Sequence, residues 1–391
     1  MVLKAVKIRI YPNVNQSIQL AQTFGCVRFV WNQMLDMQIE RRKNNPEAKY
    51  INGFGMNNLL KRLKQEHPWL KKAESTALQS ASRDLDDAFQ RFFKGQNDFP
   101  RFKSKKYAQS YTSKQVNNNI MVLDNHHIKL PKLNSMYFRA GRLPEGKIKR
   151  VTVRQNSAGQ YYISILTESE NQTLPKTGKQ IGGDLGLKAL LNLSNGEKIP
   201  NHHFNDKLSK KIHHWERLRS RRCLEAKKQI AWDKHNHVLE PRRLSDFKNY
   251  RKACRMVAKY KMKVANQQLD QLQKLTTKLV RENDVIVLEK LNVKGMMKNH
   301  HLARAIGGVS WSKLVDILQY KCDWYGKKLI QIDPSYTSQI CAECGERNNR
   351  LGLGKAEWLA VREWDCPHCG SHLDRDINAA KVILKHGLVA Q

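Results

Sequence analysis

Four of the eight cysteines form two C-x-x-C pairs near the C-terminus. Cys341 pairs with Cys344 in CAECG, and Cys366 pairs with Cys369 in CPHCG. Thiolates in two such pairs bind one zinc ion tetrahedrally, and the glycine after each pair lets backbone amides turn toward the sulfurs. A redox-active pair is the alternative for a single C-x-x-C motif, but two pairs in series favour a structural zinc site.

Three acidic residues stand beside apolar segments. They are Asp184 in IGGDLGLK, Glu289 in DVIVLEKL and Asp376 in DRDINAAKVIL. Carboxylate oxygens are the ligands that Mg²⁺ prefers, which makes a shared magnesium site one interpretation. The alternatives are a turn cap, a strand-end salt bridge and an acid at a helix N-terminus, respectively. Asp374 is interpreted as the cap of that last helix or as an auxiliary acid.

The whole chain is strongly basic. It has 391 residues, with 70 Lys and Arg against 35 Asp and Glu, which gives a formal net charge of +35. Because such an excess repels itself, it indicates a large polyanionic partner, and nucleic acid is the first candidate. A basic surface kept for solubility and a membrane-binding surface are the weaker alternatives. No apolar run approaches the roughly 18 residues of a membrane span, and the start MVLKAVKIRIYPN does not read as a signal peptide, so we expect an intracellular protein.

One segment mixes basic and aromatic residues in the way that nucleic-acid contacts require. FPRFKSKKYAQSYTS, residues 99–113, carries turn residues, four basic residues and interleaved Phe and Tyr. Lys and Arg suit phosphate contacts, and aromatic rings suit base stacking. A plain surface loop is the equal alternative. The candidates are Arg101, Lys103, Lys105, Lys106 and Tyr111.

The hydrophobic pattern predicts the elements that must position these residues. Residues 2–11 alternate like a strand, two amphipathic helical segments follow, and residues 119–166 return to a period of two, which predicts a small antiparallel sheet or barrel that the first strand could join. A polar linker predicts a boundary near residue 175. Beyond it the order is a strand with Asp184, a hairpin strand, basic helices, a strand ending in Glu289, a helix, a strand, the cysteine segment and a helix that begins near Asp376.

This order resembles the RNase H-like fold. In that fold the acids of the first strand, a later strand and the last helix converge. Two metal ions roughly 3.5–4 Å apart can then stabilise the attacking and leaving oxygens in phosphodiester hydrolysis.

A more specific resemblance covers nearly the whole chain. GGDLGLK, VIVLEKL, CAECG with CPHCG, and DRDINAA look like the RuvC nuclease and zinc-finger signatures of the TnpB family, the RNA-guided endonucleases of bacterial insertion sequences that are ancestral to type V CRISPR effectors. YPNVNQ, GCVRFVWNQML, FPRFKSK and KLTTKLV are similar to blocks of the same family outside the nuclease.

The resemblance implies an activity. A guide RNA from the element's end would direct cutting of double-stranded DNA beside a short target-adjacent motif, with no membrane partner and no obligatory protein oligomer. Asp184, Glu289 and Asp376 would be the catalytic ligands of two Mg²⁺ ions, and the four cysteines would hold one Zn²⁺. Gln79 matches a stretch that lies near the target-adjacent motif in relatives. The implied location is the bacterial cytoplasm, with action at the nucleoid.

The resemblance also implies an α/β fold class with four parts. They are a wedge-like β-barrel at 1–12 and 114–175, a helical recognition lobe at 13–113, a RuvC-like nuclease domain at 176–334 and 373–391, and a zinc-finger insert at 335–372. Three other functions fit parts of this pattern. A cut-and-paste transposase orders its acids differently, a non-cleaving RNA-guided DNA binder would not need all three acids, and a zinc-ribbon RNA-binding protein would explain charge and cysteines alone.

Overall fold

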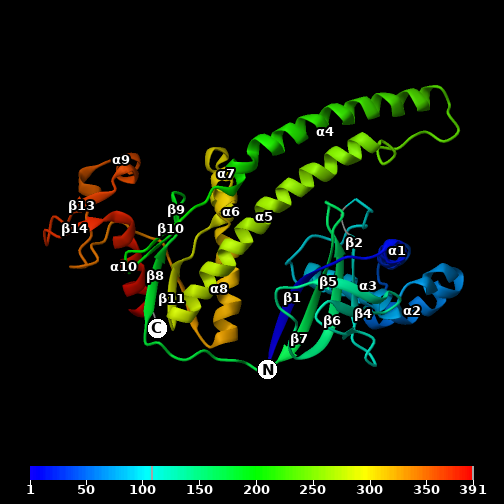
Figure 1. Ribbon diagram of the computed structural model, residues 1–391, viewed down its shortest axis with the longest axis horizontal. Coiled ribbons are helices and arrows are strands. Elements are labelled where there is room, and N and C mark those ends of the chain that lie inside the picture. The colour runs from blue at the N-terminus through cyan, green and yellow to red at the C-terminus, as the bar shows by residue number, and fades with distance from the viewer. Residues whose placement is uncertain (107–108, 390–391) are drawn as a thin grey trace. The chain divides into compact units, whose positions relative to one another are not determined.

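The chain folds into two compact units of mixed α/β structure (Figure 1). The computed structural model describes residues 1–106 and 109–389, and the division falls between Glu170 and Asn171. This division is close to the boundary near residue 175 that the polar linker predicts. Among the described residues, none of the helices combines the length and apolar character needed to cross a bilayer.

The first unit is built on a seven-stranded antiparallel sheet in the order β2-β6-β7-β1-β5-β4-β3. The N-terminal strand pairs with β7 along its whole length, from Val2 opposite Ser169 to Ile10 opposite Tyr161. The predicted sheet and its use of the first strand are therefore confirmed. The strands are β1 (Val2–Ile10), β2 (Gln109–Lys114), β3 (Met121–Val122), β4 (His127–Leu130), β5 (Asn134–Arg139), β6 (Lys147–Gln155) and β7 (Tyr161–Ser169).

Helices inserted between β1 and β2 cover this sheet. The first begins where Asn13 and Gln16 form a capping box, in which each side chain accepts a hydrogen bond from the other's backbone amide at 2.8–3.0 Å. Its apolar face, with Leu20 and Phe24, is buried in one core with Ile8, Ile163 and their neighbours. The elements are α1 (Val14–Asn44), α2 (Gly53–Glu66), the short 3₁₀ helix Pro68–Lys72 and α3 (Ser75–Phe93). Strand β2 begins at Gln109, so the sheet resumes before residue 114.

The second unit is built on a five-stranded mixed sheet in the order β10-β9-β8-β11-β12. The first three strands form an antiparallel meander, whereas β11 lies parallel to both β8 and β12. Short apolar runs form the central strands because both faces are covered. The strands are β8 (Gln180–Asp184), β9 (Ala189–Leu193), β10 (Lys198–Pro200), β11 (Val285–Glu289) and β12 (Lys328–Ile332).

Helices cover both faces of this sheet. Ile286 and Leu288 are buried on one face with α5 (Lys248–Glu282) and α8 (Trp311–Tyr325), whereas Val287 is buried on the other against α10 (Arg375–Val389). Helix α10 lies very close to the strands: a Cβ on Gly387 would stand 2.3 Å from Val287 Cγ1. The shorter helices α6 (Val293–Met296) and α7 (His300–Val309) connect β11 to α8.

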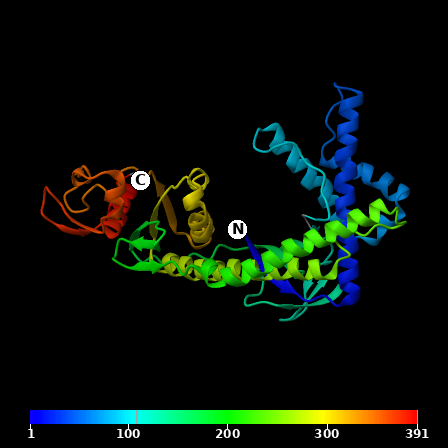
Figure 2. The same ribbon diagram turned by 90° about the horizontal axis from the view of Figure 1, so that it is seen from above.

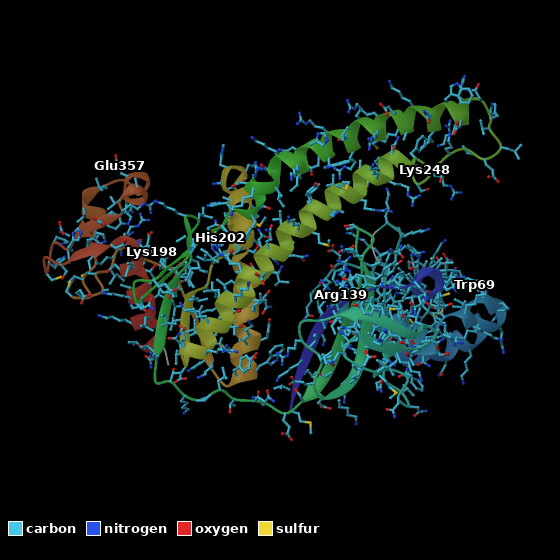
Figure 3. All side chains as sticks on the ribbon, viewed as in Figure 1. Trp69, Arg139, Lys198, His202, Lys248 and Glu357 are labelled. Carbon is cyan, nitrogen blue, oxygen red and sulfur yellow. The ribbon has the colours of Figure 1, made fainter. Side chains whose placement is uncertain are left out.

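Helix α4 (Phe204–His235) and helix α5 run side by side as a long antiparallel hairpin, which both ribbon views show (Figures 1 and 2). In the part of the hairpin that extends beyond the sheet, few residues are buried. Lys and Arg far outnumber Asp and Glu on both helices. The side chains project outward with nitrogen at their tips, as at Lys248 (Figure 3). A bidentate pair closes the hairpin end, where Arg242 donates to both oxygens of buried Asp233 at 2.6 and 2.8 Å.

The segment between β12 and α10 is small and has a hydrophobic core of its own. It holds a 3₁₀ turn (Arg350–Gly352), helix α9 (Lys355–Ala360) and the hairpin of β13 (Glu363–Asp365) with β14 (His372–Asp374). Its core consists of Trp358, Trp364, Leu373 and two of the clustered cysteines. Strand β14 continues directly into α10, so this segment fixes where the last helix begins.

Candidate functional site

Two of the three predicted acids end adjacent parallel strands. Asp184 is the last residue of β8 and Glu289 is the last residue of β11. The register pairs Gly183 with Leu288, so the two acids follow at the same edge of the sheet. Glu289 is buried and Asp184 is half-buried. Sequence-distant carboxylates are brought together here because parallel strands present their carboxyl ends on one side.

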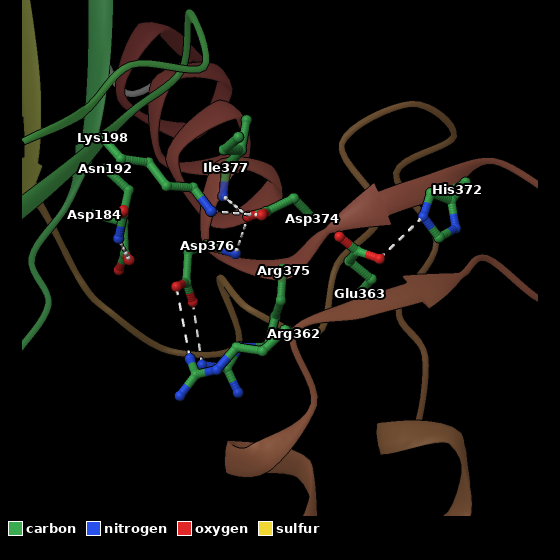
Figure 4. Close-up of polar contacts among 10 residues, drawn as sticks. All are labelled: Asp184, Asn192, Lys198, Arg362, Glu363, His372, Asp374, Arg375, Asp376 and Ile377. Atoms are coloured by element: carbon green, nitrogen blue, oxygen red, sulfur yellow. Dashed lines mark hydrogen bonds and ion pairs between the residues drawn. The ribbon is translucent and has the colours of Figure 1, made fainter. Parts of the chain in front are cut away.

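The third acid reaches the same edge from α10. Asp376 lies in the first turn of this helix, and its charge adds to the burial that raises the pKa of Asp184. Asp374 Oδ1 accepts the backbone amides of Asp376 and Ile377 at 3.1 and 3.0 Å (Figure 4). The prediction that Asp374 caps the helix is therefore confirmed. We call Asp184, Glu289 and Asp376 the carboxylate site.

Neighbouring side chains fix the orientation of each carboxylate. Asn192, which stands opposite Asp184 in the β8–β9 ladder, donates from Nδ2 to Asp184 Oδ2 at 3.2 Å. Thr337 donates from its buried hydroxyl to Glu289 Oε1 at 2.6 Å. The sequence interpretation missed both residues. The turn at Gly186, which joins β8 to β9, could have identified Asn192, but no local signal identifies Thr337.

Two arginines hold Asp376. Arg375 donates from one guanidinium nitrogen to Asp376 Oδ1 at 3.1 Å and from another to the Trp358 carbonyl at 2.7 Å. Arg362 Nη1 lies 3.7 Å from Asp376 Oδ2 (Figure 4). Arg362 directly precedes β13, and Arg375, the first residue of α10, bonds to the Trp358 carbonyl of the same segment, which therefore contributes directly to the position of this acid.

Burial and mutual repulsion make the site unfavourable for negative charge by itself. Burial raises the pKa of Asp184 to about 6, with the charge of Asp376 adding to the rise and the Asn192 hydrogen bond opposing it. Burial and the charge of Asp184 raise the pKa of Glu289 to about 7, against the Thr337 hydrogen bond. A nearby cation would favour the ionised form of both groups.

The four clustered cysteines converge as predicted. Their sulfurs lie within 4.8 Å of one another, with 3.8 Å between Cys341 and Cys369 and 3.7 Å between Cys344 and Cys366. A tetrahedral metal with bonds of about 2.3 Å to sulfur has S–S edges of about 3.8 Å, so the four thiols fit one ion. In the part of the chain that the structure describes, no three carboxylate or imidazole groups lie as close together as these thiols.

The cysteine cluster is tied to the start of α10 by buried Asn378. This side chain accepts the Ala342 amide at 2.7 Å and donates to the Ile340 carbonyl at 2.7 Å. Asn378 stands two residues after Asp376 on the same helix. The first C-x-x-C turn and the third acid therefore share one rigid support, which the sequence alone did not indicate.

The predicted nucleic-acid contacts have different surroundings in the structure. Gln79, Arg101, Lys105 and Lys106 are exposed. Lys103 is partly buried, with Nζ 3.3 Å from the centre of the Trp31 ring, and burial lowers its pKa to about 8. Tyr111 is a correction: its ring is 5 % exposed and packs against Phe24 at 5.8 Å between centroids, because β2 turns it into the core. It is not available for base stacking in this structure.

Three family models match parts of the chain. They are described as "Helix-turn-helix domain" over residues 1–47, "Probable transposase" over residues 164–300 and "Cas12f1-like, TNB domain" over residues 311–383. The first covers β1 and α1, and the third covers the cysteine cluster and most of α10. Asp184 and Glu289 thus fall within the second matched region, and Asp376 falls within the third.

Relatives match over nearly the whole chain. A protein of Streptomyces pristinaespiralis named "Putative RNA-guided DNA endonuclease" is 35% identical over 100% of this chain and 90% of its own length. InsQ of Escherichia coli K12, which carries the same description, is 31% identical over 98% of this chain and 92% of its own. In fold, the chain is similar to Cas12f1 in a solved complex with sgRNA and target DNA, with a TM-score of 0.57 at 14% identity and 98% coverage of both chains. The chain belongs to the TnpB family, as its motifs indicated.

Proposed function

We propose that this protein is an RNA-guided DNA endonuclease. A guide RNA derived from the end of its own mobile element would select the target, and the protein would cut double-stranded DNA beside a short target-adjacent motif. The observation that carries this proposal is the carboxylate site, where Asp184 and Glu289 end adjacent strands and Asp376 starts the helix beside them. Its relatives carry names that state the same activity.

The carboxylate site suits divalent metal ions. Mg²⁺ ions bound there would supply the positive charge that stabilises the attacking and leaving oxygens of a phosphodiester. The raised pKa values of Asp184 and Glu289 support this assignment, because a half-buried and a buried acid at one edge need a compensating cation to remain ionised. Asn192 Oδ1 is buried beside them without a hydrogen-bond partner among the described residues, which leaves an acceptor for a further polar group.

The chain's own residues have distinct roles in this proposal. Asp184, Glu289 and Asp376 hold the ions. Asn192 and Thr337 each hold one oxygen of a carboxylate in place, in Asp184 and Glu289 respectively. Because α10 packs closely against both β8 and β11, the ligands are held on rigid elements and not on loops. Such preorganisation is what phosphodiester chemistry requires of a protein scaffold.

The cysteine cluster is assigned to one structural zinc ion. Cytosolic thiols in a closed four-sulfur set favour zinc over a disulfide. Asn378 and Arg375 link this segment to the first turn of α10. Zinc would therefore stabilise the position of Asp376 without contacting the substrate.

The basic surfaces are assigned to the guide RNA and the target DNA. A net charge of +35 requires neutralisation by phosphates, and the α4–α5 hairpin carries much of it. The exposed candidates Gln79, Arg101, Lys105 and Lys106 stay proposals for contacts of the first unit. Lys103 stays a weaker one, since its ammonium faces Trp31.

The two sheets support the proposed domain assignment. The strand order β10-β9-β8-β11-β12, with its antiparallel meander and two parallel strands, supports an RNase H-like, RuvC-type nuclease domain at 176–334 and 373–391. The cysteine segment at 335–372 is the insert. The seven-stranded sheet supports the wedge-like barrel, with the helical lobe inserted after β1; its second part begins at β2, earlier than residue 114.

The test is cleavage of a guide-matched plasmid with Mg²⁺, paired with a gel shift on the same target. Asp184→Ala, Glu289→Ala and Asp376→Ala should each abolish cutting of both strands, since one centre cuts them in turn. Guide-dependent DNA binding should survive, because base pairing and backbone contacts supply it. Asp270→Ala is the control, since this exposed acid pairs only with Lys274 among the described ion pairs. If the Asp184→Ala protein still nicks one strand of the plasmid, the proposal that a single carboxylate site cuts both strands is wrong.

A further inference from the structure

A groove of about 550 Å³ lies in the first unit; it includes Phe99, the first residue of the 99–113 segment, but none of the candidate contact residues named above. It is lined by the end of α1, by residues 48–50 and by the end of α3 with Phe99. We call it the aromatic groove, and define it by Arg41, Arg42, Tyr50, Phe92, Phe93 and Phe99. All of these residues belong to the helical part of the unit.

Aromatic rings form the groove in an array of edge and stacked contacts. Phe93 packs against Tyr50 at 5.2 Å between centroids, and Phe99 packs against Phe92 at 5.3 Å. The rings are nevertheless open to solvent: Phe93 is 55 % exposed, Phe99 43 % and Phe92 36 %. A cluster of large apolar side chains left in water marks a binding surface, because its exposure costs free energy that a ligand can recover.

The rim of the groove is basic. Arg41, Arg42 and Lys43 occupy the last turn of α1, and Lys49 stands across from them. All four are exposed. In the described part of the chain, Lys43 lies 4.0 Å from Glu40, and Arg41, Arg42 and Lys49 have no ion pair with a carboxylate. Asp86 accepts the hydroxyl of Tyr50, a residue that lines the groove, at 2.8 Å.

This chemistry selects the occupant. A second copy of the chain is disfavoured, because a twofold contact would bring one basic rim against another. A nucleic-acid duplex is disfavoured as the occupant, because its bases stack on one another inside the helix and leave no free face for the phenylalanine rings. An unpaired nucleotide offers a flat base for the phenylalanines and a phosphate for the arginines.

We propose that the aromatic groove binds an unpaired segment of the guide RNA, an inference that rests on the proposed function. One base would stack on Phe93 and Phe99, and the flanking phosphates would lie between Arg42 and Lys49. The groove thereby adds affinity for single-stranded RNA without reading its sequence, since every base presents a stacking face.

The test uses the full chain purified with its guide RNA. In Phe93→Ala/Phe99→Ala, we expect guide-RNA affinity at fixed salt to fall about 10- to 100-fold, because stacking contributes about 1–3 kcal/mol per base. Phe54→Ala is the control, since this ring in α2 is 76 % exposed but does not line the groove. Arg42→Gln/Lys49→Gln leaves the aromatic floor intact and should weaken RNA binding as well, with a smaller salt dependence.

Photocrosslinking identifies the occupant. Guide RNA carrying 4-thiouridine should crosslink to the peptide that contains Phe93 or Phe99, and the crosslink should be lost in the double variant. Unchanged RNA affinity in both groove variants, or crosslinks from target DNA alone, would overturn the proposal. So would a mass measurement in which the groove variants only dissociate a protein dimer. Failure of the wild-type protein to bind RNA at all would instead contradict the proposed function.

Discussion

Gly182→Ala should displace Asp376 from Asp184 and Glu289 without removing any of the three acids. Gly182 lies in β8, two residues before Asp184, where α10 crosses the strand. A Cβ at this position would stand 2.2 Å from the Ala380 carbonyl oxygen and 2.7 Å from Leu384 Cβ. The obstacle is backbone, which cannot rotate away as the end of a side chain can. Helix α10 must therefore move, and Asp376 moves with it.

The size of the effect follows from these distances. An ordinary carbon–oxygen contact is about 1 Å longer than the distance the new methyl would impose, so α10 must shift by about that amount. Overpacking of this kind costs about 1–3 kcal/mol. A misplacement of about 1 Å in a catalytic constellation can cost about 10²-fold in rate. We therefore expect at least a hundredfold loss of plasmid cleavage with a lower unfolding temperature, by about 2–12 °C.

The assay compares cleavage rate, guide-dependent DNA binding and thermal unfolding in the same preparations. DNA binding should be retained, because the basic surfaces are untouched. Gly141→Ala is the control, since a Cβ there meets nothing within 4 Å and Gly141 is not among the positive-φ glycines. If Gly182→Ala cleaves at the wild-type rate while remaining folded, the proposed dependence of the site on the β8–α10 contact is wrong.

Three further predictions concern the supports of the site. Cys366→Ser should lose the bound zinc, which elemental analysis would measure. Cleavage should fall as well, because the cysteine segment that anchors Arg375 and Asn378 becomes looser. Full cleavage activity without zinc would contradict this prediction. Asp374→Ala should cost about 1 kcal/mol in unfolding free energy through the lost cap of α10 and should retain at least partial cleavage, whereas complete loss would make it a ligand. Asp284 accepts Lys327, and this ion pair lowers the pKa of Asp284 to about 2. Asp284→Asn should therefore be less stable than wild type near pH 6, and urea titrations should show this difference shrinking as pH falls from about 4 toward 2, since protonation removes the same interaction from the wild-type protein.

The sequence alone determined the chemistry and the order of the elements. Two C-x-x-C pairs predict a four-thiol site because ligand type and spacing are local properties, and the sulfurs do converge. Apolar runs of short length predicted the strands that end in Asp184 and Glu289. The acid at the start of the last helix was recognisable from capping residues, since N-terminal helix signals also act within a few residues of chain.

Tertiary structure decided how those parts meet. The pairing of β8 with β11 joins residues about a hundred positions apart, and no local pattern specifies which strands become neighbours. The same applies to Thr337 on Glu289 and to Asn378 under the cysteine turn, whose contacts exist only after the sheet, α10 and the cysteine segment have packed. Tyr111 is the converse case: its basic and aromatic surroundings in the sequence indicate a surface, but the β2 pleat buries its ring. Residue type limits what a side chain can do, and packing decides whether it is exposed to do it.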